Sequence, residues 1–292
     1  MVYLESVAFP DADAEWNFRM GVKRTCYNTM YPFGVLTAAG LSQLSFEPIT
    51  ILYGGNGSGK TTVLNVIAEK LRLLRETPFN RSNFFEDYVD LCRVWLENPV
   101  SSESRIVTSD DVFDYMLSVR SLNEGIDRKK EELFHEHTAA RHSSVRVRSL
   151  DDYDALKRQN SARRRTQSSF VREQLMDNVR EQSNGESASF FFRQRVREDA
   201  LYLLDEPENS LSAARQIELA DFLEESARYA GCQLVISTHS PFLLSMRGAK
   251  IYDLDARPAA LKCWTELESV RTYYDFFMQH RAAFERGVSE PF

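Results

Sequence analysis

A glycine-rich stretch between an apolar run and an amphipathic segment constrains the fold of this 292-residue chain more than any other feature. Residues 49–53 (ITILY) are apolar over the length of a buried strand, and the turn GGNGSGKT follows at 54–61. Beyond the turn, apolar side chains recur at helical spacing at Val63, Leu64, Ile67, Leu71 and Leu74. The sequence therefore predicts a buried strand, a tight turn and a helix in direct succession.

The turn fits the pattern G-x-x-x-x-G-K-[ST], which binds nucleotide phosphates when it joins a strand to a helix. Its glycines let backbone N–H groups surround a phosphate, and the helix N-terminus adds partial positive charge. Lys60 is placed to reach the β- and γ-phosphates, and Thr61 to bind Mg²⁺ through its hydroxyl. Kinases, GTPases and many ATPases share such a loop. The predicted nucleotide contacts are Gly54, Gly55, Asn56, Gly57, Ser58, Gly59, Lys60, Thr61 and Thr62.

Further strand-like runs lie at 200–204 and 233–238, with a helical stripe between them. Strands that alternate with helices predict an α/β fold with a mostly parallel sheet flanked by helices. We also expect a helix over 84–96 and a strand that runs into a helix over 104–117.

Residues 120–182 differ from the rest, because they are charged, poor in strand signals and mostly helical in pattern. We expect them to form a helical insertion within one domain that spans residues 1–292. No sustained heptad repeat is present in this segment, which excludes a long coiled-coil rod.

Two acids and a histidine follow buried strands further along the chain. In LYLLDEP, Asp205 ends a strand and is placed to bind magnesium, and Glu206 beside it could polarise an attacking water. The same pair could instead cap the following helix. In VISTHS, His239 follows another strand and points to the same edge of the sheet, although a lone histidine is often structural.

Four motifs in order, GGNGSGKT, SNGE, LYLLDEPENSLS and VISTHS, resemble the nucleotide-binding domains of the ABC ATPase superfamily. More narrowly, they resemble its soluble SMC/RecF-like branch and the related bacterial "AAA family ATPases". The resemblance implies an ABC-type P-loop NTPase core that hydrolyses ATP with Mg²⁺, with Lys60, Glu206 and His239 as catalytic residues and Thr61 and Asp205 at the metal. It also implies a homodimer that closes around two ATP molecules.

In this family the loop before the acidic strand is a signature motif that contacts the ATP held by the other subunit. Carried over to this chain, the resemblance assigns that role to Ser183, Asn184, Gly185 and Glu186. The Ser183 hydroxyl and the Gly185 N–H would donate to the γ-phosphate, and Glu186 would lie near the ribose. Two departures stand out: Asn184 replaces a common glycine, and Ser212 stands where transporters usually carry aspartate.

Two further parts of the nucleotide site stay open at this point. The glutamine that the family carries between the phosphate loop and the signature is not evident, and Asp110 or Asp111 could either replace it or cap the following helix. The aromatic segment CYNTMYPF at 26–33 could stack on adenine or pack in the core.

Composition limits the cellular setting. The chain has 36 Lys and Arg against 43 Asp and Glu, and its net charge of −7 does not suggest a protein that coats nucleic acid. The four cysteines are scattered, as is typical of reduced thiols in a cytoplasm. Because no leader pattern and no long apolar run are present, we expect a cytoplasmic protein without membrane insertion.

One stretch departs from this acidic average. Residues Arg141–Arg172 hold nine Lys and Arg and three Asp and Glu, a local charge of +6. Such a patch could bind nucleic acid through phosphates, form a solvated helix face, or dock on the acidic remainder of the chain or on a partner protein.

The sequence therefore favours ATP hydrolysis, ATP + H₂O to ADP + phosphate, by an ATP-sandwiched dimer that switches conformation. The process served could be DNA maintenance, phage defence or regulation of a partner protein. One alternative is an ATP-gated module for nucleic acid or a partner protein, with incidental turnover. Another is the nucleotide-binding subunit of a transporter, which the absent glutamine and the large insertion disfavour.

The signature assignment predicts that Ser183→Arg keeps ATP binding by each monomer but abolishes the closed dimer. Each charge-assisted contact to phosphate is worth about 1.5–3 kcal/mol, and a symmetric dimer repeats the contact at two sites. Dimer affinity should fall by several orders of magnitude, measured by light scattering with ATP in a Glu206→Gln background. An ATP-dependent dimer that survives the substitution would reduce SNGE to an ordinary turn.

Overall fold

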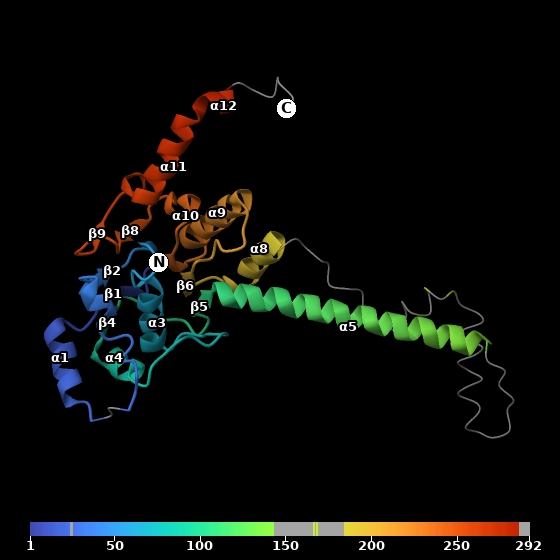
Figure 1. The fold of residues 1–292 in the computed structure, drawn as a ribbon, viewed down its shortest axis with the longest axis horizontal. Coiled ribbons are helices and arrows are strands. Elements are labelled where there is room, and N and C mark those ends of the chain that lie inside the picture. The colour runs from blue at the N-terminus through green and yellow to red at the C-terminus, as the bar shows by residue number, and fades with distance from the viewer. Residues whose placement is uncertain (24–25, 143–165, 167, 169–183, 286–292) are drawn as a thin grey trace. The chain divides into compact units, whose positions relative to one another are not determined.

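The computed structural model describes residues 1–23, 26–142, 166, 168 and 184–285 (Figure 1). The chain divides into two compact units, one of residues Met1–Val112 with Asn184–Phe292 and one of residues Phe113–Ser183. Helix α5 (Ser109–His142) begins in the first unit and continues into the second, of which it forms the described helix. The expected insertion at 120–182 within a single domain stays a prediction, since most of that segment lies outside the described residues.

A six-stranded sheet in the order β5-β6-β7-β3-β8-β9 forms the centre of the first unit. Every neighbouring pair is parallel except β8 and β9. This confirms the predicted α/β fold with a mostly parallel sheet. The bounds are β3 Ile49–Tyr53, β5 Arg105–Thr108, β6 Leu201–Asp205, β7 Gln233–Ser237, β8 Lys250–Asp253 and β9 Ala260–Leu261.

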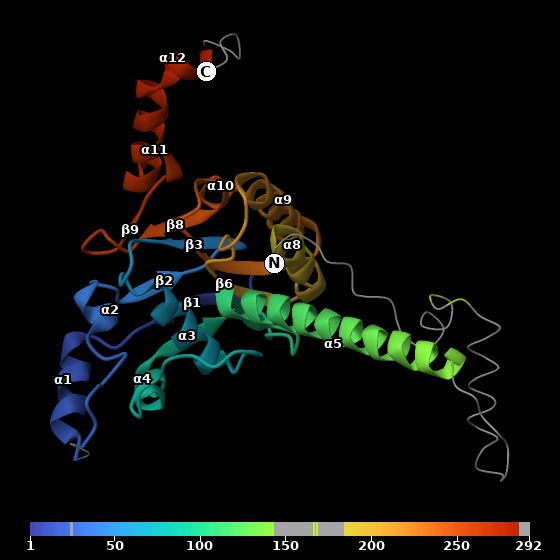
Figure 2. The ribbon, with the colours of Figure 1, turned by 45° about the vertical axis from the view of Figure 1, so that its right-hand side comes forward.

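Helices cover both faces of this sheet, so its central strands β3, β6 and β7 are buried along almost their whole length rather than on alternate residues. Figure 2 shows α3 (Lys60–Leu71) on one side and α9 (Ala213–Tyr229) with α10 (Pro241–Leu244) on the other. Helix α8 (Asn184–Arg195) packs beside α9. The buried stripe of α3 lies in one core cluster with residues of β6 and β7.

Helix α3 begins where the sequence predicts and ends three residues before Leu74. Arg72 adopts the left-handed conformation (φ 53°), and its N–H returns to the carbonyl of Ala68, which ends the helix. Leu74 instead bridges to Arg105 as extended backbone. The apolar residue at position 74 therefore belongs to the edge of the sheet and not to the helix.

The predicted helix over 84–96 is wrong in its second half. Helix α4 covers Phe85–Leu91, Cys92 is extended, and Arg93–Leu96 form strand β4. This strand pairs antiparallel with β1 (Leu4–Ala8), which also pairs with β2 (Gln43–Ser45) in a separate three-stranded sheet. Val94 and Trp95 favour the extended state, and a partner strand near the N-terminus stabilises it.

The remaining elements are α1 Ala12–Gly21, α2 Val35–Ala38, the 3₁₀ helix η1 Trp264–Glu266, α11 Glu268–Gln279 and α12 Arg281–Glu285. Among the helices that the structure describes, none combines the length and apolar character needed to cross a bilayer.

The buried side chain of Gln233 joins the two sheets of the first unit. Its Oε1 accepts from the N–H groups of Tyr3 and Leu4, both at 2.8 Å, and its Nε2 donates to the Leu4 carbonyl at 2.8 Å. The side chain is fully buried at the first position of β7. It thereby pairs backbone groups of the N-terminal strand that would otherwise be buried without partners.

Gln233→Leu is expected to destabilise the protein by about 3 kcal/mol or more, because a buried unpaired polar group costs about 1–3 kcal/mol and three lose their partner. Urea unfolding measures the loss. Gln43→Leu on β2, whose side chain is exposed, serves as the control and should change stability little. Equal stability of the two variants would show that Gln233 does not hold the N-terminal strand.

Candidate active site

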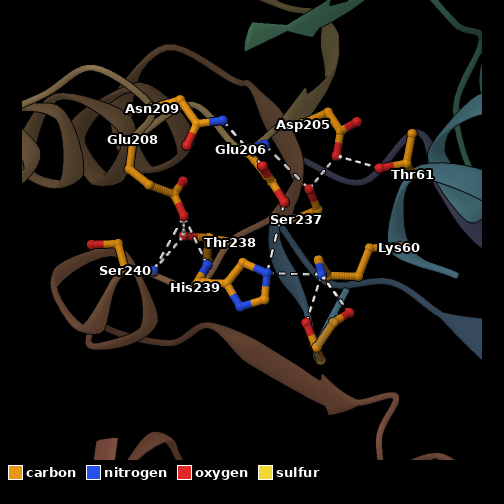
Figure 3. A network of polar contacts seen from close by, with 12 residues as sticks. Lys60, Thr61, Asp205, Glu206, Glu208, Asn209, Ser237, Thr238, His239 and Ser240 are labelled. Atoms are coloured by element: carbon orange, nitrogen blue, oxygen red, sulfur yellow. Dashed lines mark hydrogen bonds and ion pairs between the residues drawn. The ribbon is translucent and has the colours of Figure 1, made fainter. Parts of the chain in front are cut away.

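The candidate site lies where β3, β6 and β7 end at the same edge of the sheet. In the parallel register Asp205 lies opposite Ser237, and Ser237 lies opposite Leu52 near the end of β3. The segments that follow these strands therefore meet. Figure 3 shows Lys60, Asp205, Glu206 and His239 together at this edge, as the sequence predicts.

The glycine-rich loop has a conformation that other residues adopt poorly. Gly57 and Gly59 have φ angles of 83° and 99°, in the left-handed region. A Cβ on Gly59 would also come within 3.0 Å of Leu36 Cδ2. The loop lines a cavity of about 360 Å³ whose walls are Tyr31, Val35, Asn56, Gly57, Ser58, Gly59, Lys60, Thr61, Thr62 and Glu206.

Lys60 is buried and turns its ammonium group back onto its own loop. Its Nζ donates to the carbonyls of Gly54 at 2.5 Å and Gly55 at 3.1 Å, and lies 2.9 Å from His239 Nε2. An ammonium can only donate, so Nε2 is the acceptor in this contact. Burial lowers the pKa of Lys60, although the nearby Glu206 and Asp205 raise it.

Thr61 and Asp205 form an oxygen pair of the kind that Mg²⁺ prefers. Thr61 Oγ1 donates to Asp205 Oδ1 at 3.2 Å, and the hydroxyl of Ser237 donates to the same oxygen. Burial raises the pKa of Asp205, and the two hydrogen bonds lower it by less, so the pKa is raised on balance. In the described part of the chain no three His, Cys, Asp or Glu gather as a metal site, so a metal here would need phosphate or water ligands as well.

Glu206 lines the loop cavity from a strained backbone position. Its φ of 49° is unusual for a residue other than glycine. Its N–H donates to the Ser237 carbonyl at 3.0 Å, and its Oε2 accepts from Asn209 Nδ2 at 3.1 Å. Its Oε1 lies 3.7 Å from His239 Nε2. Nε2 of His239 is therefore close to both Lys60 and Glu206.

The aromatic residues of segment 26–33 lie in two different surroundings. Phe33 is buried and stacks on Phe18 with ring centroids 4.5 Å apart, so it belongs to the core. Tyr31 lines the loop cavity, and its hydroxyl lies 3.0 Å from Thr62 Oγ1. Tyr31 is thus the aromatic residue of this segment that faces the site.

Asp110 and Asp111, the two acids considered for the glutamine position, lie in different surroundings. Asp111 is buried and caps α5, because its Oδ2 accepts from the N–H of Thr108 at 2.7 Å and its Oδ1 from the N–H of Thr77 at 3.0 Å. Asp110 lines a cavity of about 580 Å³ that Thr61 and Asp205 also line. Asp110 is therefore the acid of this pair at the predicted metal site.

The signature residues are only partly described. Ser183 lies outside the described residues, and Asn184, Gly185 and Glu186 form the first turn of α8. Their assignment to the ATP of another subunit stays a prediction.

Sequence reasoning missed three polar residues at this edge. They are Ser237, which bonds Asp205; Glu208, which bonds the segment around His239; and Asp255, whose carboxylate accepts from the N–H of Gly55 at 2.7 and 2.9 Å. Asp255 follows β8, another parallel strand that ends at this edge, so the strand-end rule that found Asp205 could have found it too.

Two family models match the chain. One described as "ABC transporter" matches residues 42–209, and one described as "AAA domain, putative AbiEii toxin, Type IV TA system" matches residues 181–245. No curated protein matches the sequence.

Among solved structures, the Smc head domain of Pyrococcus furiosus, bound to the C-terminal domain of ScpA, is 13% identical, with 96% of this chain and 100% of that chain covered at a TM-score of 0.43. An SmcHead bound to the C-winged helix domain of ScpA is 15% identical over 72% and 88%, at 0.36. A nucleotide-free ATP-binding cassette from an ABC transporter is 14% identical over 81% and 89%, at 0.38.

The raised pKa of Asp205 predicts how the free protein responds to pH. The folded state binds this proton more tightly than the unfolded state, so stability falls as pH rises from the ordinary aspartate pKa, about 4, to the raised value. Asp205→Asn should therefore raise the melting temperature at pH 7 without nucleotide or Mg²⁺, and the gain should vanish near pH 4.

Ser237→Ala provides the matched comparison, because it removes a hydrogen bond that favours the carboxylate. This variant should melt below the wild type at pH 7. A gain for Asp205→Asn that is the same at every pH would contradict the assignment to the carboxyl group.

Proposed function

Because the chain belongs to the ABC family of ATPases, we propose that it binds ATP with Mg²⁺ and hydrolyses it to ADP and phosphate as a dimer that closes around two ATP molecules. The observation that carries this proposal is the meeting of Lys60, the Thr61–Asp205 pair, Glu206 and His239 beside the glycine-rich loop. These groups supply the positive charge, metal ligands and base that phosphoryl transfer to water requires.

Lys60 and the loop N–H groups hold the phosphates in this proposal. The Lys60 ammonium leaves the carbonyls of Gly54 and Gly55 and takes phosphate oxygens in their place. Thr61 and Asp205 would hold Mg²⁺, which would supply positive charge against the β- and γ-phosphates.

Glu206 acts on the attacking water as general base or orienting group. Its carboxylate lines the cavity of the loop and carries a hydrogen bond from Asn209, which fixes its direction. The Nε2 atom of His239 lies close to both Lys60 and Glu206, and in this proposal the ring senses the γ-phosphate from that position. Tyr31 supports adenine binding from the cavity wall, and Asp110 takes the place of the family's glutamine.

The second half of each site comes from the other subunit in this proposal. Ser183, Gly185 and Glu186 precede or begin α8, and a helix start is suited to an anion. We place the protein in the cytoplasm, as a single ABC-type domain with the 120–182 insertion. Membrane insertion is not part of this proposal.

The process served is best supported as defence. The match of residues 181–245 to a model described for a toxin–antitoxin system favours defence over DNA maintenance. Nucleic acid binding by Arg141–Arg172 and regulation of a partner protein remain compatible with either process.

Glu206→Gln should keep ATP affinity and slow turnover by about 10²-fold or more, within the range for loss of a general base. It should accumulate an ATP-bound dimer, seen by size-exclusion chromatography with light scattering. Lys60→Ala is the matched comparison, and it should lose ATP affinity, turnover and ATP-driven dimerisation together. Normal turnover by Glu206→Gln would remove Glu206 from this role, and full ATP affinity in Lys60→Ala would refute the loop assignment.

A further inference from the structure

We propose that Glu208 is a positioning residue for turnover, whose buried carboxylate holds residues 238–240 so that His239 keeps its Nε2 between Lys60 and Glu206. This inference rests on the proposed ATP hydrolysis, and it assigns to Glu208 no contact with nucleotide or water.

The contacts of Glu208 are directed at the backbone that carries His239 (Figure 3). Its Oε1 accepts from the hydroxyl of Thr238 at 2.6 Å, from the N–H of His239 at 2.7 Å and from the N–H of Ser240 at 3.2 Å. One oxygen thus receives three donors from three consecutive residues. This arrangement fixes the backbone on both sides of the His239 Cα.

The carboxylate is costly to keep where it lies. Glu208 is 9% exposed, burial raises its pKa, and its Oε2 is buried without a partner among the described residues. Burying a charged group is unfavourable unless hydrogen bonds compensate for the lost water. The hydrogen bonds that the carboxylate receives from other residues all come from residues 238–240, which is expected if holding that segment is the role of the side chain.

The same segment is held from its other side by α9. Ser240 Oγ donates to Gln216 Oε1 at 2.7 Å and also caps α10, and Gln216 Nε2 donates to the Leu211 carbonyl at 2.9 Å. Glu208 and Leu211 both lie in the loop between β6 and α9. The loop that carries Glu206 is therefore tied twice to the segment that carries His239.

The consequence concerns the relative position of two proposed catalytic groups. Glu206 and Glu208 are separated only by Pro207, whose ring restricts the backbone between them. Because Glu208 joins this loop to residues 238–240, we expect it to hold the backbone of His239 at a fixed distance from the backbone of Glu206. In the structure Glu206 Oε1 and His239 Nε2 are 3.7 Å apart.

The test compares Glu208→Ala and Glu208→Gln with the wild type. Misplacement of a reacting group by about 1 Å can cost about 10²-fold in rate, so Glu208→Ala should lower kcat by about 10- to 100-fold and leave KM for ATP unchanged. Glu208→Gln keeps an oxygen acceptor for the three donors and should restore most of kcat. Glu224→Ala is the control, because Glu224 accepts a backbone N–H from Arg247 at 2.8 Å on the surface of α9.

A double-substitution cycle with His239→Ala separates positioning from a general structural effect. If Glu208 acts through His239, single-turnover rates of His239→Ala should not fall further when Glu208→Ala is added. Additive losses would overturn the proposal, as would a wild-type kcat in Glu208→Ala.

Amide hydrogen exchange of the nucleotide-free protein gives a readout that does not need turnover. Glu208→Ala should speed exchange at His239 and Ser240, while Glu208→Gln and Glu224→Ala should not. Unchanged exchange in Glu208→Ala would overturn the proposal. Absence of ATP hydrolysis in the wild type would instead refute the proposed function, and the exchange data would still decide whether Glu208 holds residues 238–240.

Discussion

The parallel hydrogen bonding of β6, β7 and β3 is the constraint on which the rest of the site depends. It sets Asp205 opposite Ser237, and Ser237 opposite Leu52, so that the three strands end together. Asp205 ends its strand, and Glu206 and His239 follow within two residues of the ends of β6 and β7, so none of these three side chains needs to reach far. A shift of one residue in this register would separate the Asp205 carboxylate from both of its hydroxyl partners.

The sequence was sufficient for strands β3, β5, β6 and β7 of the six-stranded sheet, but not for β8 and β9, and for the meeting of Lys60, Asp205 and His239 at one edge. Uninterrupted apolar runs such as 49–53 and 201–204 can only be buried, and helices between them require a parallel sheet. In such a sheet the carboxyl ends of neighbouring strands meet, which is why Lys60, Asp205 and His239 could be predicted to lie together. The pattern of the glycine-rich loop depends on backbone geometry alone, which the sequence encodes locally.

What the sequence did not reveal depends on partners that are remote along the chain. Residues 93–96 follow a helix and become a strand only because β1, near the N-terminus, offers them a pairing edge. The side chain of Asp111 accepts a hydrogen bond from the N–H of Thr77, 34 residues earlier in the chain, in addition to the local one from Thr108. The burial of Glu208 goes with contacts to residues about thirty positions further on. Local sequence patterns do not predict contacts between residues that are far apart in the chain.

Asp255 gives the glycine-rich loop a shape before any ligand arrives. Its carboxylate receives the N–H of Gly55 from a position 200 residues later in the chain, beyond the end of β8. Glycines allow a loop many conformations, so the loop loses much conformational entropy when it becomes ordered. A ligand that must order the loop therefore binds more weakly. By fixing the first peptide of the loop during folding, Asp255 moves that entropy loss from the binding step to the folding step. The last strands of the sheet are thus part of what makes the loop receptive, although they lie far from it in sequence.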